Sequence, residues 1–455
     1  MKLPALPIDF QPLSSSWVGK ASLAAGSLLL GNWVFNDLFH VPGGGFGLVV
    51  VGAGIWWLAR PGAPARFEAP SSVEGWTKRC QQVLDQFESL EEEADTAADG
   101  RRQQRLQELD AVLEHVGPQS LAVVGSGSGE LPEKSVVESA IAGSTPLTLC
   151  WARSLSQKDD SWLWPVALHQ QDALLYVLPL PLMAADLLWL DQVPDDQPAW
   201  VIVSWSDEAS WIDQLEALQA QLPARWNERV LRWSGQGDEL RLALHPARRL
   251  LEHPQRNLNA TRQRLLCRLH RTWQAELEHL RRQRFNGLQQ GTQWLVAGAV
   301  FASPVPSADL LAIAVANGLM IKEMAKIWSC SWQPDSLQIA AKHLAGAALA
   351  QGVVEWSSQA LLGVAKLEGT SWMAAGTMQA LSAAYLTRVV GRSMADWLAL
   401  NSGVDELDLE ELKRQAPLLV AKAAETERLD WAGFLQQATR WVRESAGKSF
   451  QAEAL

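Results

Sequence analysis

The sequence contains only four cysteines and eight histidines, and neither residue type clusters. No two cysteines stand at the spacing of a metal site or a redox motif, which predicts separate reduced thiols and excludes a disulfide framework. Among the histidines, only His270 and His279 share a predicted helix, and their spacing does not define a metal site. No metal centre is therefore expected. The cysteines are Cys80, Cys150, Cys267 and Cys330.

The chain also lacks an excess of basic residues. Its formal net charge is −11 and its isoelectric point is about 5.3, which argues against general nucleic-acid binding. Tyrosine is rare, with 2 residues, whereas tryptophan occurs 23 times. Many of the tryptophans lie in apolar segments, where a protein core and a membrane interface both suit them. With 455 residues and 48% hydrophobic content, the chain can build two or three domains.

Two apolar runs within residues 1–60 predict an N-terminal transmembrane helical hairpin. Residues 41–59 carry no charge and are long enough to cross a bilayer as a helix, whereas residues 21–35 need Lys20 to extend toward the interface. Basic residues flank the hairpin and the short link has none, which predicts that both ends face the cytoplasm. A buried helical hairpin in a soluble core is the alternative interpretation.

The next two segments differ in their periodicity. Residues 61–118 predict a proline- and glycine-containing linker, then two amphipathic helices or a short antiparallel coiled coil with a break near Asp99 and Gly100. Residues 119–246 alternate apolar and amphipathic stretches, with strands expected at "SLAVVG", "DALLYVLPL", "AWVIVSW" and "RVLRW". This alternation predicts an α/β domain with a parallel sheet that helices cover on both faces.

The C-terminal half is predicted to be helical throughout. Residues 247–292 form a basic connecting helix with ten arginines, which either contacts anionic lipid headgroups or carries an ordinary solvated face. Residues 293–455 are rich in alanine and glycine and predict an all-α domain with breaks at Pro304 and Pro306. The uncharged run 369–387 is weakly hydrophobic, so a buried helical bundle is favoured over further membrane spans.

The stretch "AVVGSGSGELPEKSVVESAIAG" has the layout of a phosphate-binding loop. A predicted strand leads into glycines and then to Lys134 and Ser135, the residue types that reach the outer phosphates and hold magnesium. The spacing is wrong, because the motif needs a glycine where Glu133 brings a negative charge toward an anion. Gly125 lies too far upstream of Glu133, and Pro132 removes an N–H donor from the loop.

Three stretches together resemble a known family. "VVGSGSGELPEKSVVESAIAG" corresponds to a phosphate-loop region, "AWVIVSWSDEA" to a strand that ends in a guanine-reading Asn-Lys-x-Asp motif, and "SPVPSADLLAIAVANGLMIKEMAKIW" to the start of a helical domain. The chain resembles bacterial, cyanobacterial-type membrane-associated GTPases that end in a YcjF-like helical domain of unknown function. The resemblance covers most of the chain and implies a P-loop GTPase-like α/β fold followed by an all-α domain.

When the functional residues of the family are matched to positions in this sequence, several of them are absent. The guanine motif keeps only Asp207, and Trp205 stands where its lysine is expected. The Asp-x-x-Gly motif that would position magnesium should precede Asp172, but "SWLWPVALHQQD" does not contain it. Losing the metal aspartate and the phosphate cradle together is expected to abolish phosphoryl transfer. The relic nucleotide-binding candidates are Gly125, Lys134, Ser135 and Asp207.

These losses predict a membrane-anchored pseudo-GTPase that acts as an interaction scaffold, with no catalytic residue and no cofactor. The alternative is an atypical switch that binds GTP and Mg²⁺ with slow or no hydrolysis. A small transporter is a third hypothesis, although the predicted spans lack the charged residues that mark a transport path. The expected partners are the lipid membrane, a second copy of the chain or a true GTPase. The resemblance implies a bacterial plasma or thylakoid membrane, with the soluble domains on the cytoplasmic side.

Overall fold

The computed structural model describes most of the chain beyond residue 67, in two compact units. We call Ala69–Leu277 the α/β unit and Glu278–Leu455 the helical unit, and each is described by itself. The predicted membrane hairpin of residues 1–60 lies outside the described residues. The described residues are 68–91, 98–126, 131–143, 145–151, 155, 162, 164–205, 207, 209–302, 306–330, 333–368, 375–402 and 408–453.

The α/β unit contains a five-stranded sheet with the order β2-β1-β3-β4-β5, and every neighbouring pair is parallel. The predicted parallel sheet is therefore confirmed. The sequence-based expectation omitted β2, which is an edge strand without a fully buried residue and so lacks a long apolar run. The strands are β1 (Gln119–Gly125), β2 (Leu147–Trp151), β3 (Ala173–Leu178), β4 (Ala199–Ser204) and β5 (Val230–Trp233).

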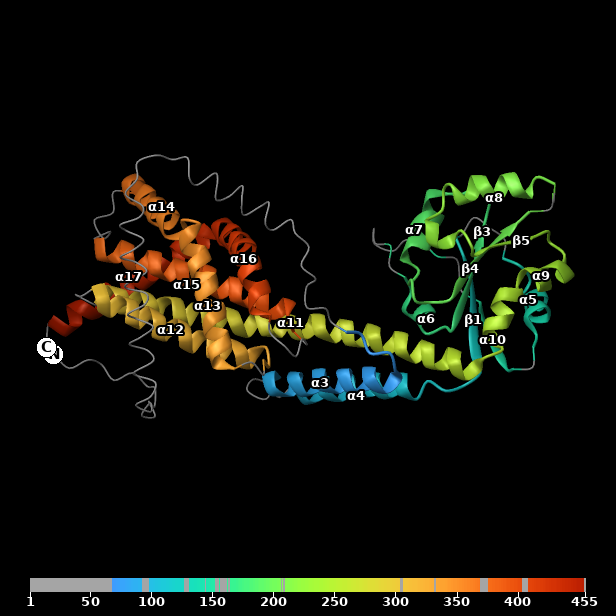
Figure 1. Ribbon diagram of the computed structural model, residues 1–455, viewed down its shortest axis with the longest axis horizontal. Coiled ribbons are helices and arrows are strands. Elements are labelled where there is room, and N and C mark those ends of the chain that lie inside the picture. Colours follow the sequence, from blue (N-terminus) through green and yellow to red (C-terminus); the bar gives the residue numbers. More distant parts are fainter. Residues whose placement is uncertain are drawn as a thin grey trace. The chain divides into compact units, whose positions relative to one another are not determined.

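Helices cover both faces of this sheet (Figure 1). One face packs against α6 (Val166–His169), α7 (Ala184–Gln192) and α8 (Trp211–Gln219). The other packs against α5 (Lys134–Ile141), α9 (Gly237–Ala243) and α10 (His245–Leu251). Every residue of β3 is buried, which explains why "ALLYVL" is apolar throughout instead of alternating.

A helical pair precedes the sheet in sequence and packs along the first part of α11. The pair is α3 (Val73–Glu91) and α4 (Ala98–Leu113), so the predicted break at Asp99 and Gly100 falls within the first turn of α4. Cys80 of α3 is fully buried, and its Sγ lies 3.7 Å from the Leu266 carbonyl oxygen. All four cysteines are free thiols.

The long helix α11 (Pro254–Ala302, 49 residues) replaces the connecting helix predicted at 247–292. Residues 245–251 form the separate helix α10, because Pro254 lacks an N–H and begins a helix more readily than it continues one. The arginines of this basic region do not form one exposed stripe. Arg264 and Arg281 are buried, Arg249, Arg256 and Arg271 are exposed, and the others are half-buried.

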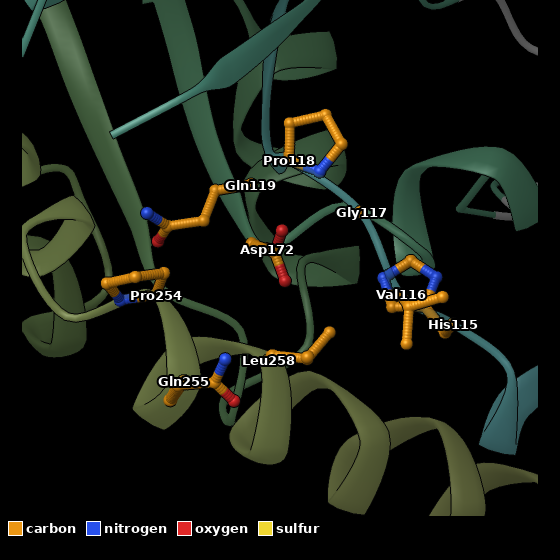
Figure 2. Close-up of a pocket in the computed structure, with 9 residues that line it drawn as sticks. All are labelled: His115, Val116, Gly117, Pro118, Gln119, Asp172, Pro254, Gln255 and Leu258. Carbon is orange, nitrogen blue, oxygen red and sulfur yellow. The ribbon is translucent and has the colours of Figure 1, made fainter. Parts of the chain in front are cut away.

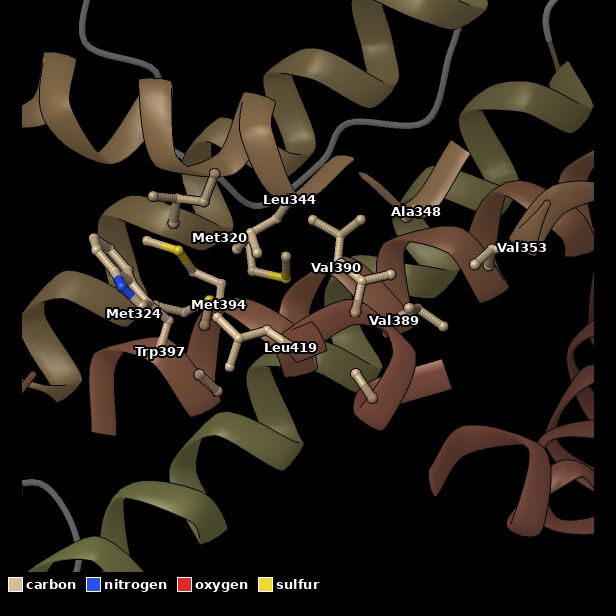
Figure 3. Close-up of a cluster of buried hydrophobic side chains, with 14 of the residues drawn as sticks. Met320, Met324, Leu344, Ala348, Val353, Val389, Val390, Met394, Trp397 and Leu419 are labelled. Carbon is tan, nitrogen blue, oxygen red and sulfur yellow. The ribbon is translucent and has the colours of Figure 1, made fainter. Parts of the chain in front are cut away.

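The helical unit packs its helices around one large core (Figure 3). Among the described helices, α15 contributes the most continuous buried surface, and Gly391 lets it approach Met320 of α12 closely, since an added Cβ would lie 3.2 Å from the Met320 Cε. The helices that follow α11 are α12 (Pro306–Ile327), α13 (Pro334–Ala350), α14 (Val353–Glu368), α15 (Ala375–Leu400), α16 (Leu409–Leu429) and α17 (Trp431–Glu453).

The apolar run 369–387 is divided in the structure. Its residues 369–374 lie outside the described part of the chain, and the remainder is the first half of α15. Leu381 and Tyr385 in this half are buried in cores within the helical unit, as expected for a helical bundle. None of the described helices combines the length and apolar character needed to cross a membrane.

A buried ionic cluster joins α15 to α16. Glu427 is 1% exposed and accepts a 2.6 Å hydrogen bond from Arg392 Nη1. It also pairs with Arg388, which in turn pairs with Asp430. Gln289 of α11 donates a 2.7 Å hydrogen bond to the Arg388 carbonyl oxygen. Three helices of this unit are therefore connected through a polar network around the buried Glu427 and Arg388, with Arg392 and Asp430 at its more exposed edge.

Candidate functional site

The sequence-predicted site residues lie where a parallel α/β sheet normally binds its ligand. The strand order reverses at β1, whose neighbours are β2 and β3, and ligands bind outside the carboxyl ends of the strands at such a point. Gly125 ends β1, Lys134 and Ser135 begin α5, and Asp207 follows β4. The fold thus brings all four residues to the same edge of the sheet.

Gly125 is required for packing at this edge. A Cβ atom placed on Gly125 would lie 3.1 Å from the Val177 carbonyl oxygen of β3 and 3.2 Å from Leu131 Cδ2. Leu131 therefore folds back over the end of β1 and packs against the α5 side of the sheet. Leu131 is half-buried and Pro132 is buried. A leucine and a proline occupy the part of the loop where a phosphate site needs open backbone N–H groups.

The first turn of α5 faces solvent. Glu133 is the N-cap residue, is exposed and makes no side-chain capping hydrogen bond. Lys134 has 58% of its side chain exposed and pairs with Glu138 one turn later, with 3.6 Å between Nζ and Oε1. Ser135 is exposed. Glu133 therefore adds a negative charge beside the helix N-terminus, where an anion such as phosphate would otherwise be favoured.

The Asp207 carboxylate forms hydrogen bonds within a local turn. Its carboxylate accepts hydrogen bonds from Ser210 Oγ at 2.6 Å and from the Ala209 N–H at 3.1 Å. The Ser210 hydrogen bond, followed by that from Ala209, lowers the pKa of Asp207. Trp205 Nε1 donates to the same Ser210 hydroxyl at 3.3 Å. Asp207 therefore shapes the entry into α8.

Sequence reasoning missed a buried polar group beside Gly125. The Tyr176 hydroxyl donates a 2.9 Å hydrogen bond to Asp186 Oδ1, and the Met183 N–H donates to Oδ2 at 3.3 Å. Asp186 is 0% exposed, and burial followed by the charge of Asp186 raises the pKa of Tyr176. The signal was available, because a tyrosine inside a fully apolar strand needs a polar partner for its hydroxyl.

The Tyr176 hydroxyl also interacts with Ser126, the first residue of the loop after β1. Asp186 lies in the first turn of α7, where its negative charge and its bond to the Met183 N–H stabilise the helix start. Tyr176, Asp186 and Ser126 thus connect the ends of β1 and β3 to α7. The buried carboxylate has hydrogen-bond partners on both oxygens and is not directed toward a ligand.

A small cavity lies at the opposite, amino edge of the sheet (Figure 2). Its volume of about 60 Å³ is far below the roughly 300–1,000 Å³ of a typical ligand pocket. Asp172 at this edge is 4% exposed and accepts hydrogen bonds from the Ser120 N–H at 2.8 Å and Thr261 Oγ1 at 2.6 Å. These contacts attach α11 to the sheet. Among the described residues, no group of histidine, cysteine, aspartate and glutamate side chains is arranged to hold a metal ion.

Comparison with known proteins identifies part of the helical region. Residues 265–425 match a domain of unknown function, DUF697. The match begins inside α11, covers α12 to α15 and ends inside α16. This finding is consistent with the YcjF-like domain that the sequence resembles. No curated protein and no solved structure matches the chain.

Proposed function

We propose that this protein is a membrane-anchored interaction scaffold whose α/β unit has a GTPase-like outline but does not hydrolyse GTP. The observation that carries the proposal is that Gly125, Lys134 and Asp207 are already in contact with neighbouring residues. Leu131 covers Gly125, Lys134 pairs with Glu138, and Asp207 holds the turn before α8. A nucleotide would have to displace these contacts and approach the exposed Glu133 carboxylate.

The atypical GTP switch remains a second candidate because of one feature of α5. The N-terminus of this helix has no side-chain cap, and Lys134 and Ser135 in its first turn are open to solvent. Free N–H groups at a helix start attract phosphate. A rearrangement of Leu131 would expose more of them. The two candidates differ in whether nucleotide stabilises the fold.

We expect GTP or GDP with Mg²⁺ at millimolar concentration to leave the melting temperature of the full-length protein unchanged. A ligand at a hundred times its dissociation constant would add about 2.7 kcal/mol to the free energy of unfolding. For a unit of this size that gain corresponds to a shift of several degrees. Differential scanning fluorimetry of the detergent-solubilised chain measures this shift directly.

A stabilisation that disappears in Lys134→Ala would instead support the switch. The matched control is Lys326→Ala, since Lys326 is also exposed and also pairs with a glutamate on its own helix, 2.8 Å from Glu323. A shift lost equally in both variants would indicate general charge effects. A shift lost only in Lys134→Ala would overturn the pseudo-GTPase proposal.

The membrane anchor is the part of the proposal that rests on the sequence of the first 60 residues. We expect the double substitution Val50→Arg, Ile55→Arg to release the protein from membranes, because each arginine at the centre of a span costs about 2.5–3.5 kcal/mol. The measurement is the fraction of the chain that stays in the membrane pellet after alkaline carbonate washing. Val50→Leu, Ile55→Leu is the control and should stay in the pellet. Equal retention of both variants would show that residues 41–59 do not anchor the protein.

Anchoring would hold the DUF697 domain at the membrane, where interaction with a second copy or a true GTPase is its proposed role. The helical unit, which holds most of the matched residues, has a large hydrophobic core and a buried Glu427 that pairs with Arg388 and Arg392, so it can present a stable surface to a partner. The position of the chain in a bacterial plasma or thylakoid membrane, with these units on the cytoplasmic side, belongs to the same proposal.

A further inference from the structure

One face of the α/β unit is formed by a chain segment that has acidic residues but no lysine or arginine. Between residues 159 and 224 the sequence has no lysine or arginine. This segment contains α6, α7 and α8, which lie together on one side of the sheet (Figure 1). The exposed acidic residues on and around α7 and α8 are Asp191, Asp195, Asp196, Asp207, Asp213 and Glu216.

Large apolar side chains are exposed within this acidic segment. The exposed fractions of Met183, Leu188 and Ile212 are 52%, 45% and 69%. On α7, the exposed residues Ala184, Leu188 and Asp191 follow helical spacing, so they form one outward stripe. A stripe that combines leucine and aspartate has no role in the core of the unit, because Trp189 and Leu190 supply the inward contacts.

The two helices are neighbours on this face. They connect the adjacent strands β3, β4 and β5 and pack on one shared hydrophobic core. Arg225, which follows α8, donates a 3.0 Å hydrogen bond to the carbonyl of Val193 at the end of α7 and pairs with Asp195. We define the α7–α8 face by these exposed residues: Met183, Leu188, Asp191, Ile212, Asp213 and Glu216.

We propose that the α7–α8 face binds a cationic amphipathic helix of a partner protein. The inference rests on the proposed role of the α/β unit as an interaction module and specifies the chemistry of its partner. A helix with leucine-like residues on one stripe would place them against Met183, Leu188 and Ile212. Lysines or arginines beside that stripe would face Asp191, Asp213 and Glu216.

The same charges disfavour two other occupants. An anionic lipid surface would repel the α7–α8 face, because the charged residues that define it, Asp191, Asp213 and Glu216, are all carboxylates. A second copy that used the same face in a two-fold dimer would place carboxylates opposite carboxylates, which is also repulsive. A cationic partner is therefore the occupant that this charge pattern favours.

The test uses the full-length protein and a fluorescently labelled synthetic helix of leucine and lysine, about four turns or roughly 14 residues long. Fluorescence anisotropy should show saturable binding that weakens as salt rises. The double variant Leu188→Lys, Ile212→Lys should bind at least tenfold more weakly, because it removes apolar contact and adds repulsion. A peptide with glutamate in place of lysine should not bind.

The matched control is Leu242→Lys, since Leu242 is 79% exposed on α9, which covers the other face of the sheet. Its affinity should equal that of the unmodified chain. Equal weakening in Leu242→Lys and the double variant, or no binding to the unmodified chain, would overturn the proposal. A dimer by sedimentation that only the double variant dissociates would identify a second copy as the occupant and would equally overturn it. None of these results depends on nucleotide, so the pseudo-GTPase proposal is tested separately.

Discussion

Replacing Glu427 with glutamine is expected to lower the free energy of unfolding of the helical unit by about 3 kcal/mol. Glu427 is 1% exposed and pairs with both Arg388 and Arg392. The glutamine keeps the shape of the side chain but leaves two guanidinium groups without their shared counter-charge. Only Asp430 then remains beside Arg388. Removing one partner of a buried pair costs more than the pair itself contributes, because the remaining charge stays desolvated.

The measurement is thermal unfolding of the full-length chain, followed by circular dichroism of its helices. A loss of about 3 kcal/mol corresponds to a drop of about 9 °C for a unit of this size. Glu425→Gln is the control, since Glu425 is exposed two residues earlier on the same helix, and it should change stability by less than about 0.5 kcal/mol. Equal effects of the two substitutions would show that the ionic cluster does not hold α15 to α16.

The second large effect is expected from Asp172→Ala at the amino edge of the sheet. Asp172 accepts hydrogen bonds from the N–H and the hydroxyl of Ser120, at 2.8 and 3.2 Å, and from Thr261 Oγ1 at 2.6 Å. Alanine leaves these donors unsatisfied in a buried place, and each buried unsatisfied group costs about 1–3 kcal/mol. We expect the α/β unit to lose about 3 kcal/mol and α11 to separate more easily from the sheet.

Hydrogen exchange of the Ser120 and Thr261 backbone amides, together with denaturant unfolding, measures both effects. Asp191→Asn serves as the control because Asp191 is exposed on α7. The control should leave exchange at the amino edge unchanged. If Asp172→Ala unfolds at the same denaturant concentration as the unmodified protein, the contacts of Asp172 do not attach α11 to the sheet.

Local patterns in the sequence were sufficient for most of the α/β unit. Apolar runs predicted β1, β3, β4 and β5, and their alternation with helical patterns predicted a parallel sheet. The proline-rich stretch after Ala302 predicted the boundary between α11 and α12. β2 was missed because an edge strand with half-exposed residues does not produce a continuous apolar run.

For the candidate site, the sequence revealed the side chains but not their contacts. Under the GTPase resemblance, Glu133 stands at a glycine position and Trp205 at a lysine position, and both residues were visible in the sequence as arguments against phosphate and guanine binding. The engagement of Asp207 with Ser210 and the packing of Leu131 over Gly125 were not visible. A sequence indicates which side chains are present, whereas their partners depend on how the loops close at the end of the sheet.

The arginines of residues 247–292 also show that the sequence alone does not reveal which side chains are buried. Their number predicted a basic helix, and the hypotheses of lipid contact and of a solvated face both treated them as surface residues. In the structure Arg264 donates a 2.7 Å hydrogen bond to the Gln171 carbonyl, and Arg281 donates a 3.0 Å hydrogen bond to Ser402 Oγ. Long side chains can be buried wherever they find acceptors, so helical periodicity alone does not show which of them face solvent.

The sequence by itself determined most of the order of strands and helices, the apolar N-terminal runs and the irregular spacing of the loop after β1, because each depends on residues close together in the chain. Only the tertiary structure decided which polar residues are buried. Tyr176 with Asp186 and Arg388 with Glu427 are pairs separated by 10 or more positions. The acidic α7–α8 face likewise exists only once two helices pack on one side of the sheet. The physical reason is that burial and hydrogen bonding depend on neighbours in space, which the packing of separate elements supplies.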